Sequence, residues 1–187
     1  ITFRELLHKL FEPIAATPAE IRASAQELAE FRPGFVRLVE LSREHNIPFT
    51  LASGGLDIYI KPALELLSPE LQSAMTLRAN HATHRDGGLT LSFPFADREG
   101  SCGQCGSCKR AVITELQNAG YRVAAIGDGN ADRCMAQAAD VLFARARLRD
   151  WCDTVQHPYV AFETFDVVID FLETNALGTN SGAARVQ

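Results

Sequence analysis

The sequence predicts an α/β fold in which a Rossmann-like parallel sheet is flanked by helices, with a partial helical cap at the N-terminus and a small β-hairpin. From residue 35 onward, short apolar runs alternate with amphipathic helical patterns. Such alternation is typical of parallel strands joined by right-handed helical crossovers. Residues 1–31 contain helical patterns but no strand pattern. The chain should therefore divide into a partial cap at 1–33, an α/β core at 34–177 and a flexible tail at 178–187.

Each element follows from a local pattern. Residues 1–31 should form two helices, and the second begins with Thr17 as N-cap, Pro18 as first helical residue and Glu20 as capping-box partner. Gly120 should end a later helix, because glycine is common just beyond helix ends. In order, we expect helices at 35–46, 56–67, 108–119, 131–138, 146–151 and 164–172, strands at 47–52, 75–80, 122–126 and 141–143, a turn at 53–55, and a hairpin over 81–94 that turns at 86–88.

The composition restricts the class of partner. Of the 187 residues, 47% are hydrophobic and 22% are charged, as is usual for a globular protein, and the net charge is −5. A general nucleic-acid binder would carry a basic face, so this balance argues against one. No apolar run approaches the roughly 18 residues that suggest a membrane span. We therefore expect a soluble, cytoplasmic protein with neither nucleic acid nor membrane as its partner.

A serine follows the first expected strand, and two glycines follow the serine. A hydroxyl and free backbone N–H groups at such a turn suit a phosphate oxygen, because glycine lets the main chain approach and the turn directs its donors inward. Ser53 and Gly54 are therefore candidate phosphate-binding residues. The alternative is an ordinary serine that caps the next helix.

A lysine stands at the start of the helix that follows the cysteine-rich loop. At that position Lys109 opposes the helix dipole by a few tenths of a kcal/mol or more. A bound anion would account for it, because the helix N-terminus and the ammonium group would act on the same negative charge. A solvated lysine beside Arg110 is the alternative.

Two aspartates lie in the loop GDGNAD after the apolar run that ends at Ile126. Ligands bind at the carboxyl ends of strands in open parallel sheets. Two carboxylates there would repel each other unless a cation lay between them, and Mg²⁺ takes oxygen ligands of this kind. Asp128 and Asp132 are therefore candidate metal ligands. In the alternative interpretation, the loop is a polar turn in which Asp132 favours a helix dipole.

The stretch CGQCGSC holds Cys102, Cys105 and Cys108. Its two Cys-x-x-Cys steps could present three thiolates to a structural zinc ion or an iron–sulfur cluster. Cys134, His81 or His84 could supply a fourth ligand. The alternative is a set of reduced thiols in a glycine-rich loop.

The order ASGG, CK and IGDGNAD resembles the second, third and fourth motifs of the haloacid-dehalogenase superfamily of phosphatases. The resemblance covers about residues 33–172 and is greatest to the subgroup that contains phosphoserine phosphatase and a methionine-salvage phosphatase. It implies Mg²⁺-dependent hydrolysis of a small phosphomonoester through an aspartyl-phosphate. By this resemblance, Asp128 is a metal ligand, Asp132 ligates the metal or orients its water, Ser53 and Gly54 bind the phosphoryl group, and Lys109 neutralises its charge.

The sequence departs from the family pattern in one respect. The family's nucleophile and its acid belong to a motif DxDxT, which does not occur here. Because the chain begins inside what resembles the cap, we expect this motif in a preceding segment and expect the 187-residue chain alone to be inactive. The strand that carries the motif should be central, so its loss should expose two strand edges. The alternatives are an inactive domain that binds phosphorylated metabolites and a cysteine-cluster metal or redox module.

Overall fold

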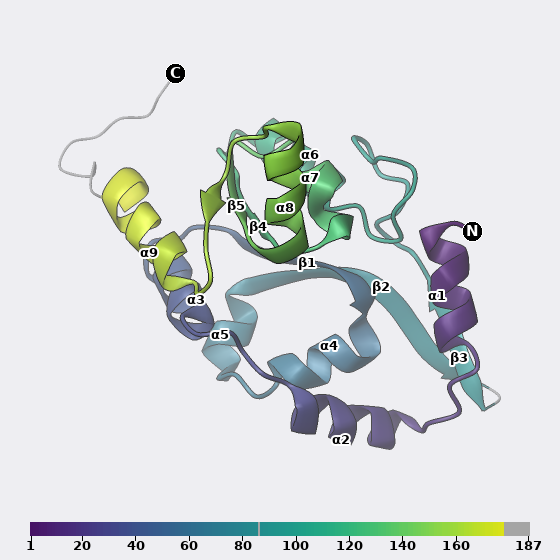
Figure 1. Cartoon of the computed structure of the whole chain (residues 1–187). Helices are drawn as coiled ribbons and strands as arrows, with labels where there is room; N and C mark the ends of the chain where they lie inside the picture. The colour runs from purple at the N-terminus through teal and green to yellow at the C-terminus, as the bar shows by residue number, and fades with distance from the viewer. Residues whose placement is uncertain (86, 178–187) are drawn as a thin grey trace.

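The computed structural model describes residues 1–85 and 87–177 and has two three-stranded sheets surrounded by helices (Figure 1). The first sheet contains β1 (Phe49–Leu56), β2 (Met75–Arg85) and β3 (Gly88–Ser92), and the second contains β4 (Ala124–Gly127), β5 (Val141–Ala144) and β6 (Val160–Ala161). The helices are α1 (Phe3–Phe11), α2 (Pro18–Leu28), α3 (Phe35–Glu44), α4 (Asp57–Leu64), α5 (Pro69–Ser73), α6 (Lys109–Asn118), η1 (Asn130–Asp132), α7 (Arg133–Ala136), α8 (Ala146–Val155), α9 (Asp166–Leu172) and η2 (Glu173–Leu177).

The strand pairing confirms the predicted α/β class. β1 pairs in parallel with β2, and β4, β5 and β6 pair in parallel with one another. β2 and β3 form the predicted antiparallel hairpin. The expected turn of this hairpin includes Asp86, which lies outside the described residues, as does the expected tail at 178–187.

Helices cover both faces of the second sheet. Alternate residues of β5 point to opposite faces, as the pleat of a strand requires. Leu142 and Ala144 pack with residues of α6, α7 and α8, whereas Phe143 packs with residues of α3 and α9. The β4–β5–β6 sheet is therefore a buried, doubly covered sheet of the kind that ends in a ligand site at its carboxyl edge.

The two N-terminal helices begin as the sequence predicts. Thr17 caps α2 in a capping box with Glu20, and Pro18 is the first helical residue. Their apolar residues join a cluster that includes Leu7 of α1, Leu56 of β1 and Leu89 of β3. In Figure 1, α1 lies beside β3 and α2 lies beside α4. These helices thus cover the first sheet, and the division of the chain into cap and core stays a prediction.

Several predicted boundaries are wrong. The Ser-Gly-Gly stretch is not a turn, because β1 continues through it to Leu56. Ala52 pairs with Arg78 and Leu56 pairs with Asn80, so four steps along β1 match two along β2 and the strand bulges between them. The helix expected at 56–67 ends at Leu64, and that expected at 131–138 is split into η1 and α7. The two-residue β6 was missed because it is too short to show a period.

The other predicted helices agree with the structure to within a few residues, whereas α5 and η2 were not predicted. Gly120 has the positive φ angle of +88° that the predicted end of α6 requires. No helix in the part of the chain that the structure describes is both long and apolar enough to span a membrane.

Candidate active site

The predicted site residues come from one edge of the fold. Ser53 lies near the end of β1, Asp128 directly follows β4, and Lys109 is the first residue of α6. Arg145, which directly follows β5, was not predicted. The signal that could have found Arg145 is its position, since the carboxyl ends of neighbouring parallel strands meet at one edge.

Asp132 is the buried centre of this edge. Only 4% of its side chain is exposed. One carboxylate oxygen forms an ion pair with Nζ of Lys109, and the other accepts hydrogen bonds from the backbone N–H groups of Asp128, at 3.0 Å, and Gly129, at 2.9 Å. Three donors thus satisfy a carboxylate that would be costly to bury alone. The bonds fix both the loop and the lysine.

Gly127 makes this arrangement sterically feasible. A Cβ atom at Gly127 would lie 2.9 Å from both Cβ and Cγ of Asp132, which is closer than carbon atoms can pack. Any larger residue there would displace Asp132 or the methyl group of Met135, which would lie 2.8 Å from the added Cβ. The first glycine of GDGNAD is therefore a packing requirement.

Lys109 does have an anion beside the N-terminus of α6, and that anion is Asp132 of the same chain. The side chain of Lys109 is 19% exposed, so the ammonium group is neither fully solvated nor fully enclosed. Arg110, the next residue, is exposed. The two adjacent cations therefore differ: Lys109 is paired with a carboxylate and partly buried, and Arg110 is exposed.

Asp128 is the accessible carboxylate of the site. Its side chain is 60% exposed, and one oxygen accepts a hydrogen bond of 3.2 Å from Nη1 of Arg145. Nε of Arg145 is buried and has no hydrogen-bond partner among the described residues, because the Glu163 carboxylate is 3.6 Å away. Asp128 can therefore still receive another ligand, and Arg145 holds it at the edge of the sheet.

Ser53 lies on the bulge of β1. Its hydroxyl accepts a hydrogen bond of 3.0 Å from the backbone N–H of Gly55. The fully buried Asn80 of β2 donates to the carbonyl of Gly54 at 2.7 Å and so holds the bulge in place. Within the described residues, Ser53 Oγ makes no hydrogen bond with the Lys109–Asp132 pair. Asn80 was missed because its sequence position shows only a strand.

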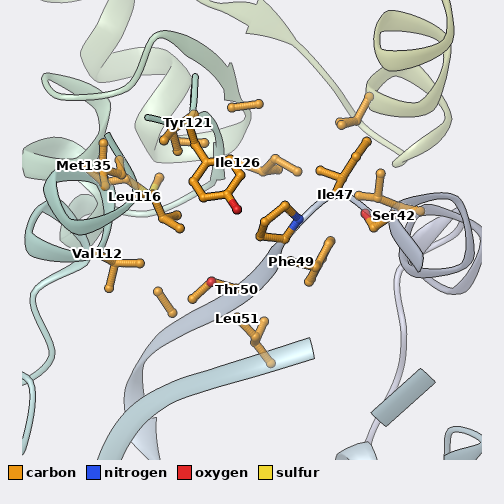
Figure 2. Close-up of a pocket in the computed structure, with 18 of the residues that line it drawn as sticks. Ser42, Ile47, Phe49, Thr50, Leu51, Val112, Leu116, Tyr121, Ile126 and Met135 are labelled. Carbon is orange, nitrogen blue, oxygen red and sulfur yellow. The ribbon is translucent and has the colours of Figure 1, made fainter. Parts of the chain in front are cut away.

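An apolar slot of about 380 Å³ separates β1 from β4 (Figure 2). Residues 49–52 of β1 and 124–126 of β4 line it consecutively, with side chains of α3, α6 and α9 around them. Because side chains alternate along a strand, consecutive lining residues mean that each strand presents its edge to the slot. In the described chain, β1 pairs only with β2 and β4 only with β5. Lys109 is among the residues that line this slot.

The three predicted cysteines come together in the structure, and Cys134 joins them. The two histidines considered as a fourth ligand do not. His81 instead forms a hydrogen bond of 2.9 Å with Asp57, and Nε2 of His84 is buried without a partner among the described residues. The cysteine cluster is thus a four-residue site next to the Lys109–Asp132 pair.

Asp128 and Asp132 differ in how well each suits a Mg²⁺ ion. Mg²⁺ takes oxygen ligands and is usually held by one or two carboxylates, with water and substrate phosphate completing its shell. Asp128 offers an exposed carboxylate of this kind. Both oxygens of Asp132 are already engaged, so Asp132 fits the role of orienting the site better than that of a direct ligand.

The parallel strands and the doubly covered sheet define a Rossmann-like α/β protein. Its polar side chains gather at the carboxyl edge of the sheet. A family model described as haloacid dehalogenase-like hydrolase matches residues 1–137. The chain belongs to this family. This result confirms the resemblance seen in the sequence.

Relatives in sequence agree with this assignment, and a solved structure shares the fold. Two bacterial proteins named 2-hydroxy-3-keto-5-methylthiopentenyl-1-phosphate phosphatase are each 30% identical. The Brevibacillus brevis protein matches over 92% of this chain and 77% of its own length, and the Exiguobacterium sibiricum protein over 80% and 66%. A phosphoserine phosphatase solved as an analogue of its phospho-aspartyl intermediate has a TM-score of 0.61 at 16% identity, over 93% of this chain and 78% of that one. The chain thus spans about two thirds to three quarters of the length of these relatives.

Proposed function

We propose that the whole protein is a Mg²⁺-dependent phosphatase that hydrolyses a small phosphomonoester through an aspartyl-phosphate. One observation carries this proposal. The buried Lys109–Asp132 pair fixes the loop that presents Asp128 at the edge of the sheet. A lysine and an accessible carboxylate at one strand end suit phosphoryl transfer, in which positioning and charge stabilisation supply most of the catalysis. The phosphatase names of the relatives support the same class.

Each residue has a distinct role in this proposal. Lys109 neutralises charge on the phosphoryl oxygens, and Ser53 and the backbone of Gly54 donate hydrogen bonds to them. Asp128 would hold Mg²⁺, and Asp132 would orient Lys109 and the loop. When bound, Mg²⁺ would offset negative charge on the phosphoryl group and its attacking oxygen.

We propose that the nucleophile is an aspartate on a further strand of the whole protein, placed in the slot between β1 and β4. The unpaired strand edges and the apolar lining of the slot support this placement. A strand there, parallel to both neighbours, would end near Lys109, where its carboxylate could attack phosphorus. The bond from phosphorus to the substrate's ester oxygen would break, and that oxygen would leave as an alcohol after taking a proton from the acid of the same DxDxT motif. Water would then release phosphate and restore the carboxylate.

The substrate we propose is a small phosphorylated metabolite of methionine salvage, with phosphoserine as the second candidate. Relatives of 30% identity carry the name of the salvage substrate, whereas the phosphoserine phosphatase resembles this chain in fold at 16% identity. The expected cytoplasmic location also remains part of the proposal.

The test compares the 187-residue chain with the natural full-length protein in a phosphate-release assay with Mg²⁺. We expect activity only in the longer protein. It should disappear when the aspartate at the end of the added strand becomes asparagine. The salvage substrate should give a kcat/KM at least about tenfold higher than phosphoserine, a difference of about 1.4 kcal/mol in transition-state binding. Robust turnover by the shorter chain would contradict the proposed nucleophile, and inactivity of a folded full-length protein would favour a metabolite-binding domain.

A further inference from the structure

We propose that Cys102, Cys105, Cys108 and Cys134 bind one structural Zn²⁺ ion as four thiolates. The four sulfur atoms all lie within 4.8 Å of one another. The sulfur of Cys102 is 3.3 Å from that of Cys105 and 3.7 Å from that of Cys108. In a tetrahedral site, Zn–S bonds of about 2.3 Å place the sulfurs about 3.8 Å apart. The four side chains therefore already have nearly the spacing that a single zinc ion requires.

The spacing argues against the other chemistry open to clustered cysteines. A disulfide needs two sulfurs about 2.05 Å apart, and all five cysteines of the chain are free thiols here. An iron–sulfur cluster inserts several metal and sulfide atoms between its ligands, so its cysteine sulfurs stand farther apart than these do. Four sulfurs that converge on one point favour one soft or borderline ion.

The surrounding backbone is shaped for thiolates. The N–H group of Cys102 donates a hydrogen bond of 3.3 Å to the sulfur of Cys108. Gly103 has a φ angle of +73°, which lets the chain reverse between Cys102 and Cys105 so that both sulfurs face the same point. Such hydrogen bonds and turns orient metal ligands and stabilise their negative charge.

The loop that carries three of the cysteines also needs a stabilising element. Residues 93–108 contain neither helix nor strand. Loops longer than about 12–15 residues without secondary structure are uncommon in compact domains and usually have a functional reason. A zinc ion would fasten this loop to α7 through Cys134, which the sequence places 26 residues beyond Cys108.

The location of the site gives the ion a specific structural task. Cys108 is the N-cap of α6 and directly precedes Lys109, and Cys134 lies two residues after Asp132. Zinc would therefore join the two segments that carry the Lys109–Asp132 ion pair. We infer that it positions this pair without touching a substrate. The metal site itself does not depend on the proposed phosphatase activity.

The first experiment measures metal content and geometry in the purified protein. We expect one zinc per chain by elemental analysis. Replacement by Co²⁺ should give the sulfur-to-cobalt charge-transfer bands and intense visible bands of a tetrahedral tetrathiolate. Zinc-free protein whose four thiols react freely, or stoichiometric iron with a cluster spectrum, would overturn the proposal.

The second experiment compares Cys134→Ala with Cys152→Ala. Cys152 is also a free cysteine, but it lies on α8, is buried in the core and is outside the cluster, so it is the matched control. Changes to residues that merely contact a ligand cost about 10–100-fold in metal affinity, so loss of a ligand should weaken zinc binding at least about 100-fold. Cys152→Ala should keep one zinc per chain. Full zinc content in Cys134→Ala would contradict the assignment.

If Cys134→Ala does not fold, the wild-type protein still provides a test. A chelator should remove zinc and expose Lys109 to amine-reactive reagents, while zinc addition should restore its protection. No change in Lys109 reactivity would exclude the positioning role. Absence of phosphatase activity in the zinc-loaded full-length protein would instead count only against the proposed function.

Discussion

The two sides of the candidate site differ in how completely their polar groups are satisfied. On the β4 side, the Asp132 carboxylate receives three donors and is almost fully buried. On the β1 side, Ser53 has a single local hydrogen bond, and Oδ1 of the buried Asn80 has no partner among the described residues. Buried polar atoms are normally paired, so an unpaired one marks a place where another group belongs. The polar groups on the β4 side are therefore held in place by partners within the chain. Those on the β1 side have room for hydrogen bonds to a ligand or a further segment.

This difference separates effects on stability from effects on activity. On the β4 side, a change in the buried Lys109–Asp132 pair should disturb both, because this pair also holds the fold together, whereas a change at the exposed Asp128 should disturb activity alone. A change at Ser53 should disturb activity alone. The following expectations concern the full-length protein and test that division.

The largest effect on turnover is expected for Asp128→Asn. This change removes one anionic oxygen from a hard-cation site, so turnover should fall about 1000-fold or more at ordinary Mg²⁺. Stability should change by less than about 1 kcal/mol, because the ion pair with Arg145 is solvent-exposed on the aspartate side. A Mg²⁺ titration of activity measures the first effect and urea unfolding the second. Asp150→Asn, a similarly exposed carboxylate on α8, is the control. Near-normal turnover would rule out Asp128 as a ligand.

The next largest effect on turnover is expected for Lys109→Ala. Loss of the cation should lower turnover about 100- to 1000-fold, as removal of a single charge-stabilising donor does elsewhere. It should also destabilise the fold by about 3–5 kcal/mol, because Asp132 is left as an unpaired buried charge. Steady-state kinetics and unfolding curves should be compared with Arg110→Ala, which alters the exposed neighbour.

A double variant distinguishes the two roles of Lys109. Lys109→Met combined with Asp132→Asn removes both charges together, so part of the lost stability should return while activity does not. Equal losses of activity in Lys109→Ala and Arg110→Ala would indicate that Lys109 does not face the reaction.

Local patterns in the sequence predicted the elements well because the relevant contacts are local. The Thr17–Glu20 capping box spans one helical turn, and the loop after β4 follows from a short apolar run that ends in glycine. Strand register was not predictable in this way. The bulge at Ser53 depends on pairing with β2 and on Asn80, which is 26 residues beyond Gly54.

The roles of the site residues were likewise only partly predictable from the sequence. The sequence placed Asp128 and Asp132 in one loop as candidate metal ligands and left open whether Asp132 ligates the metal or orients its water. Their difference arises from burial and from the directions of two backbone N–H groups, which only the folded loop defines. Arg145 and Asn80 were missed because their partners are distant in sequence.

On the β1 side, Ser53→Ala should reduce kcat/KM about 10- to 100-fold, since a hydrogen bond to a charged group contributes about 1.5–3 kcal/mol. Its effect on unfolding should stay within about 0.5 kcal/mol, because the hydroxyl makes only one local hydrogen bond in the described structure. Ser73→Ala on α5 is the matched control, with its hydroxyl bonded only to the carbonyl of Glu70. A large loss of stability in Ser53→Ala would contradict the expectation that a change on the β1 side affects activity alone.

The last expected effect is on stability alone and concerns Asp57, the partly buried carboxylate that joins the start of α4 to β2. Burial favours its neutral form, but hydrogen bonds from His81, Lys61 and the backbone N–H of Ala82 outweigh burial and lower its pKa below 3.8. A lowered pKa in the folded state stabilises the fold above the unfolded pKa, and this stabilisation is lost as pH falls through the folded pKa. Asp57→Asn should therefore cost about 1–3 kcal/mol at pH 7, and the cost should shrink as the pH falls below about 4. Urea unfolding of both proteins across this pH range measures it, with Asp150→Asn as the exposed control. A cost that is independent of pH would show that packing, and not the charge of Asp57, secures this side of the site.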